Sequence, residues 1–528
     1  MPILVQLNLD PETAADYNAI LKISGKLAKL DPSDISSVRV IKRSVDARQK
    51  NIRVNLTVEV FSAGESATPI LNPYAPVNVS NRKEVIIVGA GPAGLFAALR
   101  LIELGIKPVI IERGKDVLSR KKDIARISRD HIVDPDSNYC FGEGGAGTFS
   151  DGKLYTRSKK RGDNIRVLEI LCLHGANENI MYEAHPHLGT DKLPQIISNV
   201  RKTILDAGGH FMLEKKVTDL VIEGNQIKGI LAAGNEKYLS SEVILATGHS
   251  SRDVYEICMH RSIKLEMKSF AMGVRVEHPQ ELIDRIQYHG NPGGRYLTAA
   301  SYNIVRQVEG RGVWSFCMCP GGFIVPSATS QDEVVVNGMS PSRRNSPFAN
   351  SGIVVEIRPQ DLHDYSRYGE MAGLRYQQEL EREAWINGGQ SQMAPSQRLA
   401  DFVDGKYSSS LPENSYTPGV TSSSLHEWLP SSIGNRLRSG FRLFGSAMKG
   451  YLTNEAVVLG VESRTSSPLR IPRNPETMVH VQIAGLYPCG EGSGYSGGIV
   501  SSAVDGMRAA EALSQLSSFA SGKLRKNH

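Results

Sequence analysis

The chain has few cysteines and no long apolar run. Its six cysteines among 528 residues are sparse and irregularly spaced, which argues against a disulfide scaffold and predicts the reducing environment of the cytoplasm. No apolar run reaches the roughly 20 residues that a helix needs to cross a bilayer. The N-terminal stretch also lacks the basic segment and apolar core of a signal peptide. We therefore expect neither a membrane protein nor a secreted, disulfide-rich protein.

A strong excess of charge of one sign is also missing. The net charge of +6 is small for this length, so the chain attracts anions only weakly, and its composition does not single out nucleic acid as a partner. Apolar residues at 40% and charged residues at 22% are typical of a globular protein with a sizeable core. The length predicts two or three domains rather than one.

A glycine pattern in the stretch 84–103 indicates a bound dinucleotide. Gly89, Gly91 and Gly94 fit G-x-G-x-x-G between an apolar strand pattern, EVIIV, and a helical pattern, PAGLFAALRLIE. The first glycine permits a tight turn, the second lets the backbone approach a pyrophosphate, and the third permits close packing of the helix on the strand. Pro92 and Ala93 begin the helix, whose free N–H groups and dipole we expect to face the phosphates.

A second strand pattern follows and ends at an acid. KPVII precedes Glu112 and Arg113, about 20 residues beyond the glycines, where a carboxylate can accept hydrogen bonds from the ribose hydroxyls. A 2'-phosphate would be repelled by this carboxylate. The stretch therefore predicts FAD or NAD, and local chemistry does not separate the two.

Three segments together resemble the glutathione-reductase-like flavoprotein superfamily, which implies FAD. GAGPAGLFAA with VIIERG resembles its FAD fingerprint. SSEVILATG resembles the strand and turn that return beneath the cofactor, and Val217 is the residue that the resemblance places near the adenine. AGLYPCGEGSGYSGGIV resembles the C-terminal flavin motif, although an aspartate is usual where this chain has Glu491. The residues implied in the second and third segments are Ala246, Thr247, Gly248, Gly490, Glu491, Gly497, Gly498 and Ile499.

The C-terminal motif also has a physical interpretation of its own. SGGIVSSAVDGMRAAEAL begins with glycines and then turns helical. A helix N-terminus beside the flavin ring would stabilise negative charge on the reduced flavin. A buried helix with a glycine-rich entry is the alternative.

A further glycine-rich stretch, NYCFGEGGAGTFSDGKL, has five glycines between Gly142 and Gly152. Such backbone freedom permits close approach to a planar ligand or a pyrophosphate, so we expect Gly145, Ala146 and Thr148 at the cofactor; a flexible surface loop is the alternative. With FCMCPGG and NGMSPSRRNSPFANSG, this stretch resembles a broad, poorly characterised family of bacterial FAD-dependent dehydrogenases. The resemblance covers nearly the whole chain but supplies no substrate.

The patterns predict an α/β protein in four segments. Residues 1–75 read as strand, helix, strand and strand, a small N-terminal α+β domain. A linker with three prolines over residues 65–82 follows. Residues 76–265 are predicted as the first part of a Rossmann-like FAD-binding domain. Residues 266–450 have short strands and many Gly, Pro and Ser, and we expect an inserted α+β substrate or cap domain. Residues 451–528 return to the FAD-binding domain.

Catalytic residues are harder to identify. Cys317 and Cys319 are two apart in a strand pattern, which would place both on one face, as a redox pair or as thiols facing the flavin. Buried cysteines acting as small apolar residues are the alternative. Arg343 and Arg344 could bind a substrate carboxylate, although an exposed loop explains them equally well. His185 and His187 lack a third ligand cluster, so we predict no metal site.

The sequence therefore predicts an FAD-dependent oxidoreductase that transfers a hydride between flavin N5 and a small-molecule substrate held between the FAD-binding and inserted domains. No second dinucleotide pattern is present, so NAD(P)H would dock without a dedicated domain. An FAD monooxygenase is one alternative. Another is a flavoprotein that binds or modifies RNA, although a solvated strand face is the commoner reason for such charges. That alternative rests on a basic hairpin with Arg39, Lys42, Arg43, Arg48, Lys50 and Arg53.

Overall fold

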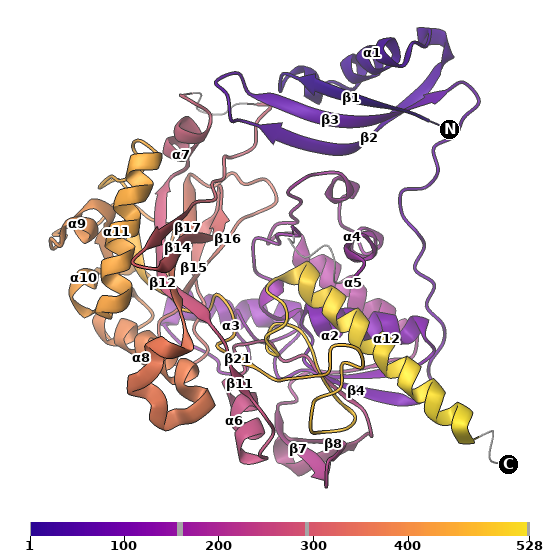
Figure 1. Ribbon diagram of the computed structural model, residues 1–528, viewed down its shortest axis with the longest axis vertical. Helices are drawn as coiled ribbons and strands as arrows, with labels where there is room; N and C mark the ends of the chain where they lie inside the picture. The colour runs from indigo at the N-terminus through magenta and orange to yellow at the C-terminus, as the bar shows by residue number, and fades with distance from the viewer. Residues whose placement is uncertain (1, 156–161, 291–294, 525–528) are drawn as a thin grey trace.

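The computed structural model describes residues 2–155, 162–290 and 295–524. Three bodies are visible in Figure 1: a small N-terminal domain, a domain around a parallel sheet, and a domain around a larger, mostly antiparallel sheet. Within the described residues, no helix combines the length and the apolar character that crossing a membrane requires.

The N-terminal domain has the predicted order of strand, helix, strand and strand. It consists of β1 (Ile3–Leu9), α1 (Tyr17–Ala28), β2 (Ile35–Asp46) and β3 (Arg53–Ser62), with the antiparallel strand order β1-β3-β2. Val54, Val58 and Val60 of β3 are fully buried and form one apolar cluster with Ile20 of α1. A long extended connection then leads to the second body along one side of the molecule (Figure 1).

The second body is built on a five-stranded parallel sheet with the order β22-β10-β4-β5-β6. Its strands are β4 (Glu84–Val88), β5 (Lys107–Ile111), β6 (His210–Met212), β10 (Val243–Leu245) and β22 (Leu486–Pro488). β4 and β5 read as continuous apolar runs because the sheet is buried on both faces. One face packs against helices, which include α2 (Pro92–Glu103), α4 (Asn164–Leu173), α5 (Leu193–Asp206) and α12 (Ile499–Leu524). Helix α12 lies along α2 although the two are far apart in the sequence (Figure 1).

The opposite face of this sheet is covered by a three-stranded antiparallel meander and flanking helices. These elements are β7 (Val217–Glu223), β8 (Gln226–Ala232), β9 (Glu236–Leu239) and α6 (Arg252–His260), while α3 (Val117–Asp130) precedes the glycine-rich loop. The short strands β11 (Glu266–Met267) and β21 (Leu469–Arg470) pair where the chain leaves this body and returns to it. The prediction of a Rossmann-like α/β domain is confirmed by this parallel sheet.

The third body is a seven-stranded sheet with the order β13-β14-β17-β12-β20-β18-β19. Its strands are β12 (Phe270–Pro279), β13 (Val305–Val308), β14 (Arg311–Cys319), β17 (Phe348–Ile357), β18 (Ala394–Arg398), β19 (Val420–Ser422) and β20 (Val457–Glu462). A hairpin of β15 (Phe323–Pro326) and β16 (Val336–Met339) accompanies it. The helices of this body are α7 (Gln280–Gln287), α8 (Ala372–Asn387), α9 (Leu399–Asp404), α10 (Leu425–Trp428) and α11 (Ser431–Ala447).

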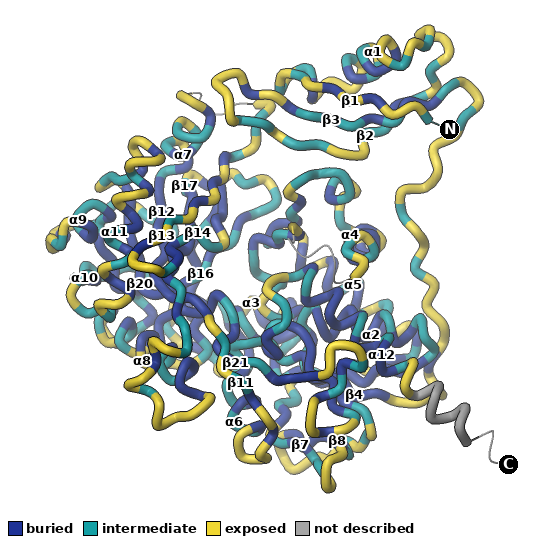
Figure 2. The backbone as a smooth tube through the Cα atoms, viewed as in Figure 1, coloured by how far each residue is buried: buried dark blue, intermediate teal, exposed yellow. Residues whose placement is uncertain are grey.

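Strand β20 bears on the expected domain boundary. It pairs with β12 on one side and β18 on the other, inside the seven-stranded sheet. The boundary expected at residue 450 therefore falls before a strand that belongs to the inserted body, and we propose that the chain returns to the FAD-binding domain after β20. Figure 2 shows that buried segments fill the interiors of both large bodies, while the N-terminal domain carries much exposed chain.

Candidate active site

A large open cavity lies where the two large bodies meet. It has about 1580 Å³ of empty space, including its mouth. One wall consists of residues at the carboxyl ends of β4, β5 and β10, among them Val88, Ile111 and Ala246, and of residues near the start of α12. The other wall includes Cys317 of β14 and Asn337 of β16. Ligands of open parallel sheets bind at this carboxyl edge.

The first glycine turn has the geometry that its pattern predicts. Gly89 has a φ of +103°, and a Cβ on Gly94 would lie 2.0 Å from the Gly89 carbonyl oxygen. Gly91 is the N-cap residue of helix α2, and no side chain caps this N-terminus. A Cβ on Gly91 would lie 4.0 Å from the Cα of Gly145, so the two glycine-rich loops approach each other closely. The uncapped N–H groups of α2 are therefore available to an anion in the cavity.

Glu112 connects the loops of this wall. Its buried carboxylate accepts hydrogen bonds from the backbone N–H groups of Ala90 at 2.9 Å, Gly114 at 3.0 Å and Gly142 at 3.0 Å. The residue also lines the cavity, and its contact with a ribose stays a prediction. The sequence pattern singled out this acid, but the pattern gave no sign that its carboxylate also fixes the backbone of three loops.

The neighbouring Arg113 closes one side of the cavity. Its guanidinium lies 4.2 Å from the ring centroid of Phe141 and forms ion pairs with Asp136 at 2.7 Å and Asp253 at 3.0 Å. Lys216 approaches the same two carboxylates at 3.4 and 3.6 Å. Two cations thus face two carboxylates here.

The second glycine-rich loop is held by a buried arginine. Arg120 of α3 is fully buried and donates to the carbonyl oxygens of Asn138, Tyr139, Glu143 and Gly145 at 2.7–2.9 Å. Burial lowers the pKa of Arg120 to about 10, so the side chain stays charged at neutral pH. Four carbonyl contacts favour the interpretation of this loop as a fixed cradle over the alternative of a flexible surface loop.

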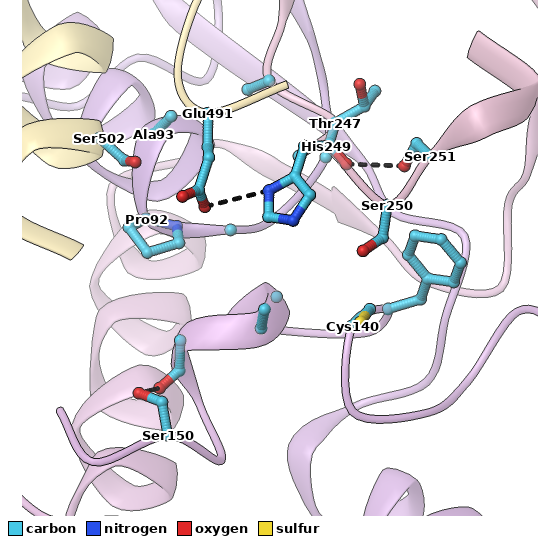
Figure 3. Close-up of a pocket in the computed structure, with 18 of the residues that line it drawn as sticks. Pro92, Ala93, Cys140, Ser150, Thr247, His249, Ser250, Ser251, Glu491 and Ser502 are labelled. Carbon is cyan, nitrogen blue, oxygen red and sulfur yellow. Dashed lines mark hydrogen bonds and ion pairs between the residues drawn. The ribbon is translucent and has the colours of Figure 1, made fainter. Parts of the chain in front are cut away.

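The C-terminal motif forms the rest of this wall. Glu491 follows β22, and its carboxylate lies 3.5 Å from Nδ1 of His249; the two side chains point toward each other across the cavity in Figure 3. The N–H of Gly490 donates to Asp505 at 2.8 Å, and Asp505 forms a buried ion pair with Arg473 at 2.6 Å. The turn is thereby fixed to the body of α12.

Most of the predicted cofactor residues line this one cavity. They are Gly89, Gly91, Pro92, Ala93, Glu112, Arg113, Gly145, Ala146, Val217, Ala246, Thr247, Gly248, Glu491, Gly497, Gly498 and Ile499. Gly94, Thr148 and Gly490 lie behind the lining instead. Gly94 packs on the first turn, and Thr148 donates to the Glu143 carbonyl at 2.9 Å. These three residues support the wall rather than face the cavity.

Cys317 and Cys319 both line the cavity as free thiols, but the strand that carries them is irregular. The pairing of β14 with β17 shifts register between Phe316 and Cys319, and Cys317 has a φ of +44°. This bulge interrupts the alternation of the strand, so Cys317 is exposed to the cavity and Cys319 is buried. The regular alternation on which the prediction of one shared face rested is therefore interrupted, and a joint role of the two thiols stays a prediction. The protein around Cys317 disfavours its thiolate and raises its pKa to about 11.

Sequence reasoning missed a charged group at this end of the cavity. The Nζ of Lys153 lies 3.3 Å from an Asp151 oxygen and 3.7 Å from the sulfur of Cys319. Arg344 approaches the same Asp151 oxygen at 3.6 Å. Asp151 and Lys153 flank Gly152 in the glycine-rich stretch, and their position beside five glycines was the available signal. The sequence suggests Arg344 as a ligand for a substrate carboxylate, but Arg344 lies behind Asp151 and is not part of the cavity lining.

A balanced charge cluster joins the two bodies at the cavity edge. Arg252 of α6 and Arg464, after β20, share the carboxylates of Glu333 and Glu381 at 2.6–3.1 Å. Burial opposes the ionisation of Glu381, but the two arginines outweigh it and lower its pKa to about 2. The cluster thus contains two cations and two carboxylates, whose formal charges sum to zero.

The basic hairpin of the N-terminal domain makes ion pairs of its own. Arg39 contacts Glu59 at 2.5 Å, Arg43 contacts Glu183 at 2.9 Å, and Arg48 contacts Asp46 at 2.6 Å. Half of its six predicted cations thus have carboxylate partners within the protein, which weakens the basis for RNA binding.

Comparison with known proteins identifies the family. Residues 269–465 match a family described as FAD-dependent protein, C-terminal domain-like, and residues 82–126 match an FAD binding domain. Residues 1–61 match a domain of unknown function. An uncharacterised protein of Clostridium beijerinckii is 38% identical over 96% of this chain and 97% of its own length. The chain belongs to a family of FAD-dependent proteins. FAD is its cofactor.

Two more distant similarities concern parts of this FAD-dependent chain or its fold. The thiamine thiazole synthase of Aeropyrum pernix is 26% identical over 30% of this chain and 46% of that protein. The crystal structure of a geranylgeranyl bacteriochlorophyll reductase-like protein from Thermoplasma acidophilum has 13% identity and a TM-score of 0.35, over 82% of this chain and 79% of that one.

The residues of the cavity fit FAD. The uncapped start of α2 can receive a diphosphate. A Cβ on Gly248 or Gly498 would meet nothing within 4 Å, so these two glycines leave open space for a ligand that approaches the backbone. Apolar lining from Val88, Ile111 and Ile499 suits the faces of an adenine or a flavin ring.

Proposed function

We propose that the protein is an FAD-dependent oxidoreductase that acts on a small organic substrate in the cavity between its two large bodies. The observation that carries this proposal is the continuity of the cavity. It runs from the glycine turns of the FAD-binding domain to Phe316, Cys317 and Asn337 of the inserted body. A cofactor alone would need only the first wall, and the second wall provides side chains that can select a substrate.

The FAD-binding wall has the task of holding the cofactor. The N–H groups at the start of α2 and the loop around Gly145 would bind the diphosphate, and Glu112 keeps these loops in register through its three hydrogen bonds. Residues Gly497 and Gly498 lead into α12, whose positive dipole end favours negative charge beside the flavin. When bound, FAD supplies hydride or electron transfer, which protein side chains cannot perform.

The inserted wall has the task of excluding water and orienting a substrate. Phe316 offers an apolar ring, and the Asn337 amide is fixed by accepting the N–H of Gly338 at 2.7 Å. Because the pKa of Cys317 is raised to about 11, its thiol is protonated at neutral pH. A protonated thiol can donate a hydrogen bond, so we propose that Cys317 orients a bound substrate rather than acts as a nucleophile. Cys319 is buried beneath it and would act through packing.

The test is reduction of the bound flavin by substrate. The purified chain, reconstituted with FAD, is mixed anaerobically with NADH, NADPH and a panel of small organic substrates while the flavin spectrum is followed. We expect at least one compound to reduce the flavin with saturation kinetics. An oxidoreductase function is contradicted if the flavin is reduced by dithionite but by no compound of a broad panel.

Oxygen consumption separates two kinds of oxidoreductase. A dehydrogenase or reductase would consume little oxygen during turnover, whereas a monooxygenase would consume oxygen with NAD(P)H only when substrate is present. The inserted wall is compatible with either, since its residues position a substrate without fixing the fate of the electrons.

A further inference from the structure

The cations that line the cavity form groups with nearby carboxylates. In one of these groups the cations outnumber the carboxylates. Arg113 and Lys216 share two carboxylates, Asp136 and Asp253. The cluster of Arg252 and Arg464 likewise has two cations and two carboxylates. Lys215 has Glu236 at 2.6 Å.

Lys153 belongs to the unbalanced group. Its carboxylate partner, Asp151, is also the partner of Arg344, so within the described residues two cations share one carboxylate. Asp151 is held 4% exposed between them. Although burial opposes its ionisation, Lys153 and Arg344 keep the pKa of Asp151 below its ordinary value. The group therefore carries one net positive charge at the cavity wall.

Neighbouring groups do not cancel this charge. Arg275, close to Cys319, is neutralised by its buried ion pair with Glu462. His187 adds no charge, because burial and then the charge of Arg344 lower its pKa to about 4. Burial raises the pKa of the Cys319 thiol, so this neighbour is neutral. Burial also opposes the charge of Lys153, but the Asp151 carboxylate favours it, and the pKa of Lys153 lies above the ordinary value. Lys153 thus stays an ammonium, and 36% of its side chain is exposed in the open cavity.

We propose that Lys153 is a substrate-binding residue and that the substrate carries a carboxylate. This inference rests on the proposed oxidoreductase function and names the substrate class of the same site. One unpaired positive charge matches one carboxylate, whereas a doubly charged phosphate would bring its second charge against Asp151. The Asn337 amide and the ring of Phe316 line the facing, inserted wall of the same cavity, which suits a carboxylate attached to a planar or apolar body.

The test compares a carboxylate probe with its neutral counterpart. The FAD-loaded protein is titrated with benzoate and, separately, with benzamide, and binding is read from the perturbation of the flavin spectrum. We expect benzoate to bind and benzamide to bind at least about tenfold more weakly. Replacing Lys153 by Met should weaken benzoate binding by about 10- to 100-fold, as expected for a lost hydrogen bond to a charged group. Lys153→Arg should retain most of the binding.

A second variant tests the charge count directly. Asp151→Asn removes the shared carboxylate and raises the net charge of the group, so benzoate should bind more tightly. The inference is overturned if benzamide binds as well as benzoate, or if Lys153→Met leaves benzoate binding unchanged. It is also overturned if Lys153→Met lowers the affinity for FAD without a selective effect on benzoate, because the lysine would then hold the cofactor. These results do not depend on turnover, so they are distinguishable from failure of the proposed oxidoreductase function.

Discussion

The two walls of the cavity are built by different means. The FAD-binding wall is mainly backbone: glycine turns, an uncapped helix start and loops fixed by Glu112 and Arg120. The inserted wall is mainly side chains, with Lys153 reaching across to Cys319. A wall made of backbone constrains which residues can stand in it, because a Cβ would collide. A wall made of side chains can change its chemistry while the fold stays the same, which is how one cofactor serves many substrates.

The largest effect should come from filling the backbone wall. In Gly94→Ala the new Cβ would lie 2.0 Å from the Gly89 carbonyl oxygen, so the turn and α2 must separate. We expect the purified variant to contain little or no FAD, as measured by flavin absorbance per chain.

The matched control is Gly434→Ala in α11. A Cβ there would meet its nearest atom at 3.5 Å, so FAD content should equal that of the unmodified protein. Equal FAD content in both variants would show that the close packing of the glycine turn is not what the cofactor requires.

The next largest effect should come from the charge cluster that joins the two large bodies at the cavity edge, and it should be an effect on stability. Glu381→Gln leaves Arg252 and Arg464 with one buried carboxylate instead of two. Breaking a buried ion pair costs about 3–5 kcal/mol, so the free energy of unfolding should fall by that order in urea titrations at neutral pH. A loss no larger than that of an exposed ion-pair control, Glu281→Gln, would contradict this.

The same glutamate gives a pH dependence with a definite sign. Its folded pKa, about 2, lies below its ordinary value, so its contribution to stability is present at neutral pH. That contribution is lost as the pH falls from about 4.5 toward 2. Stability measured across this range should fall more steeply in the unmodified protein than in Glu381→Gln, and parallel curves would disagree with the cluster described here.

A side chain that serves the backbone wall should have an intermediate effect on the cofactor. Glu112→Gln keeps the size of the residue but loses the negative charge that accepts three N–H groups. Loss of a charged acceptor costs about 1–3 kcal/mol, so FAD affinity measured by fluorescence quenching should fall about 10- to 100-fold. An unchanged affinity would mean that the loops hold their shape without this carboxylate.

The smallest effect on the cofactor should come from replacing Glu277, a buried acid of the inserted body that does not line the cavity. Burial raises the pKa of Glu277 to about 7, although Ser415 and Arg275 lower it in part. Because its folded pKa lies above its unfolded value, stability should decrease as the pH rises from about 4.5 to 7. Glu277→Gln should flatten this slope in thermal melts and leave FAD content unchanged, and a slope as steep in the variant would count against it.

The contrast between the walls also explains what the sequence predicted. Gly89, Gly91, Gly94 and Glu112 form a local pattern, because strand, turn and helix are contiguous, and their geometry followed from that pattern. Lys153, Cys319 and Arg344 come from the glycine-rich loop, the end of β14 and the connection between β16 and β17. No local spacing in the sequence indicated that these three segments meet. The bulge at Cys317 is set by pairing with β17, which a regular strand pattern does not contain.

The domain limits show the same contrast between features set by contiguous residues and features set by long-range pairing. The β-α-β-β order of the N-terminal domain was legible because its elements are consecutive. The sequence predicts the return to the FAD-binding domain at residue 451, whereas we propose that it comes after β20. The place of β20 depends on long-range pairing with β12 and β18 and not on its composition.

The account depends most on FAD and substrate sharing one cavity, and protection of Cys317 tests this directly. Cys317 is exposed to the cavity from the inserted wall, whereas Cys172 is buried outside it. The protein is treated with a maleimide with and without FAD, and labelling at each cysteine is followed by mass spectrometry. We predict that FAD slows labelling of Cys317 and leaves Cys172 unaffected. Equal labelling of Cys317 in the apoprotein and the FAD-loaded protein would contradict a shared cavity.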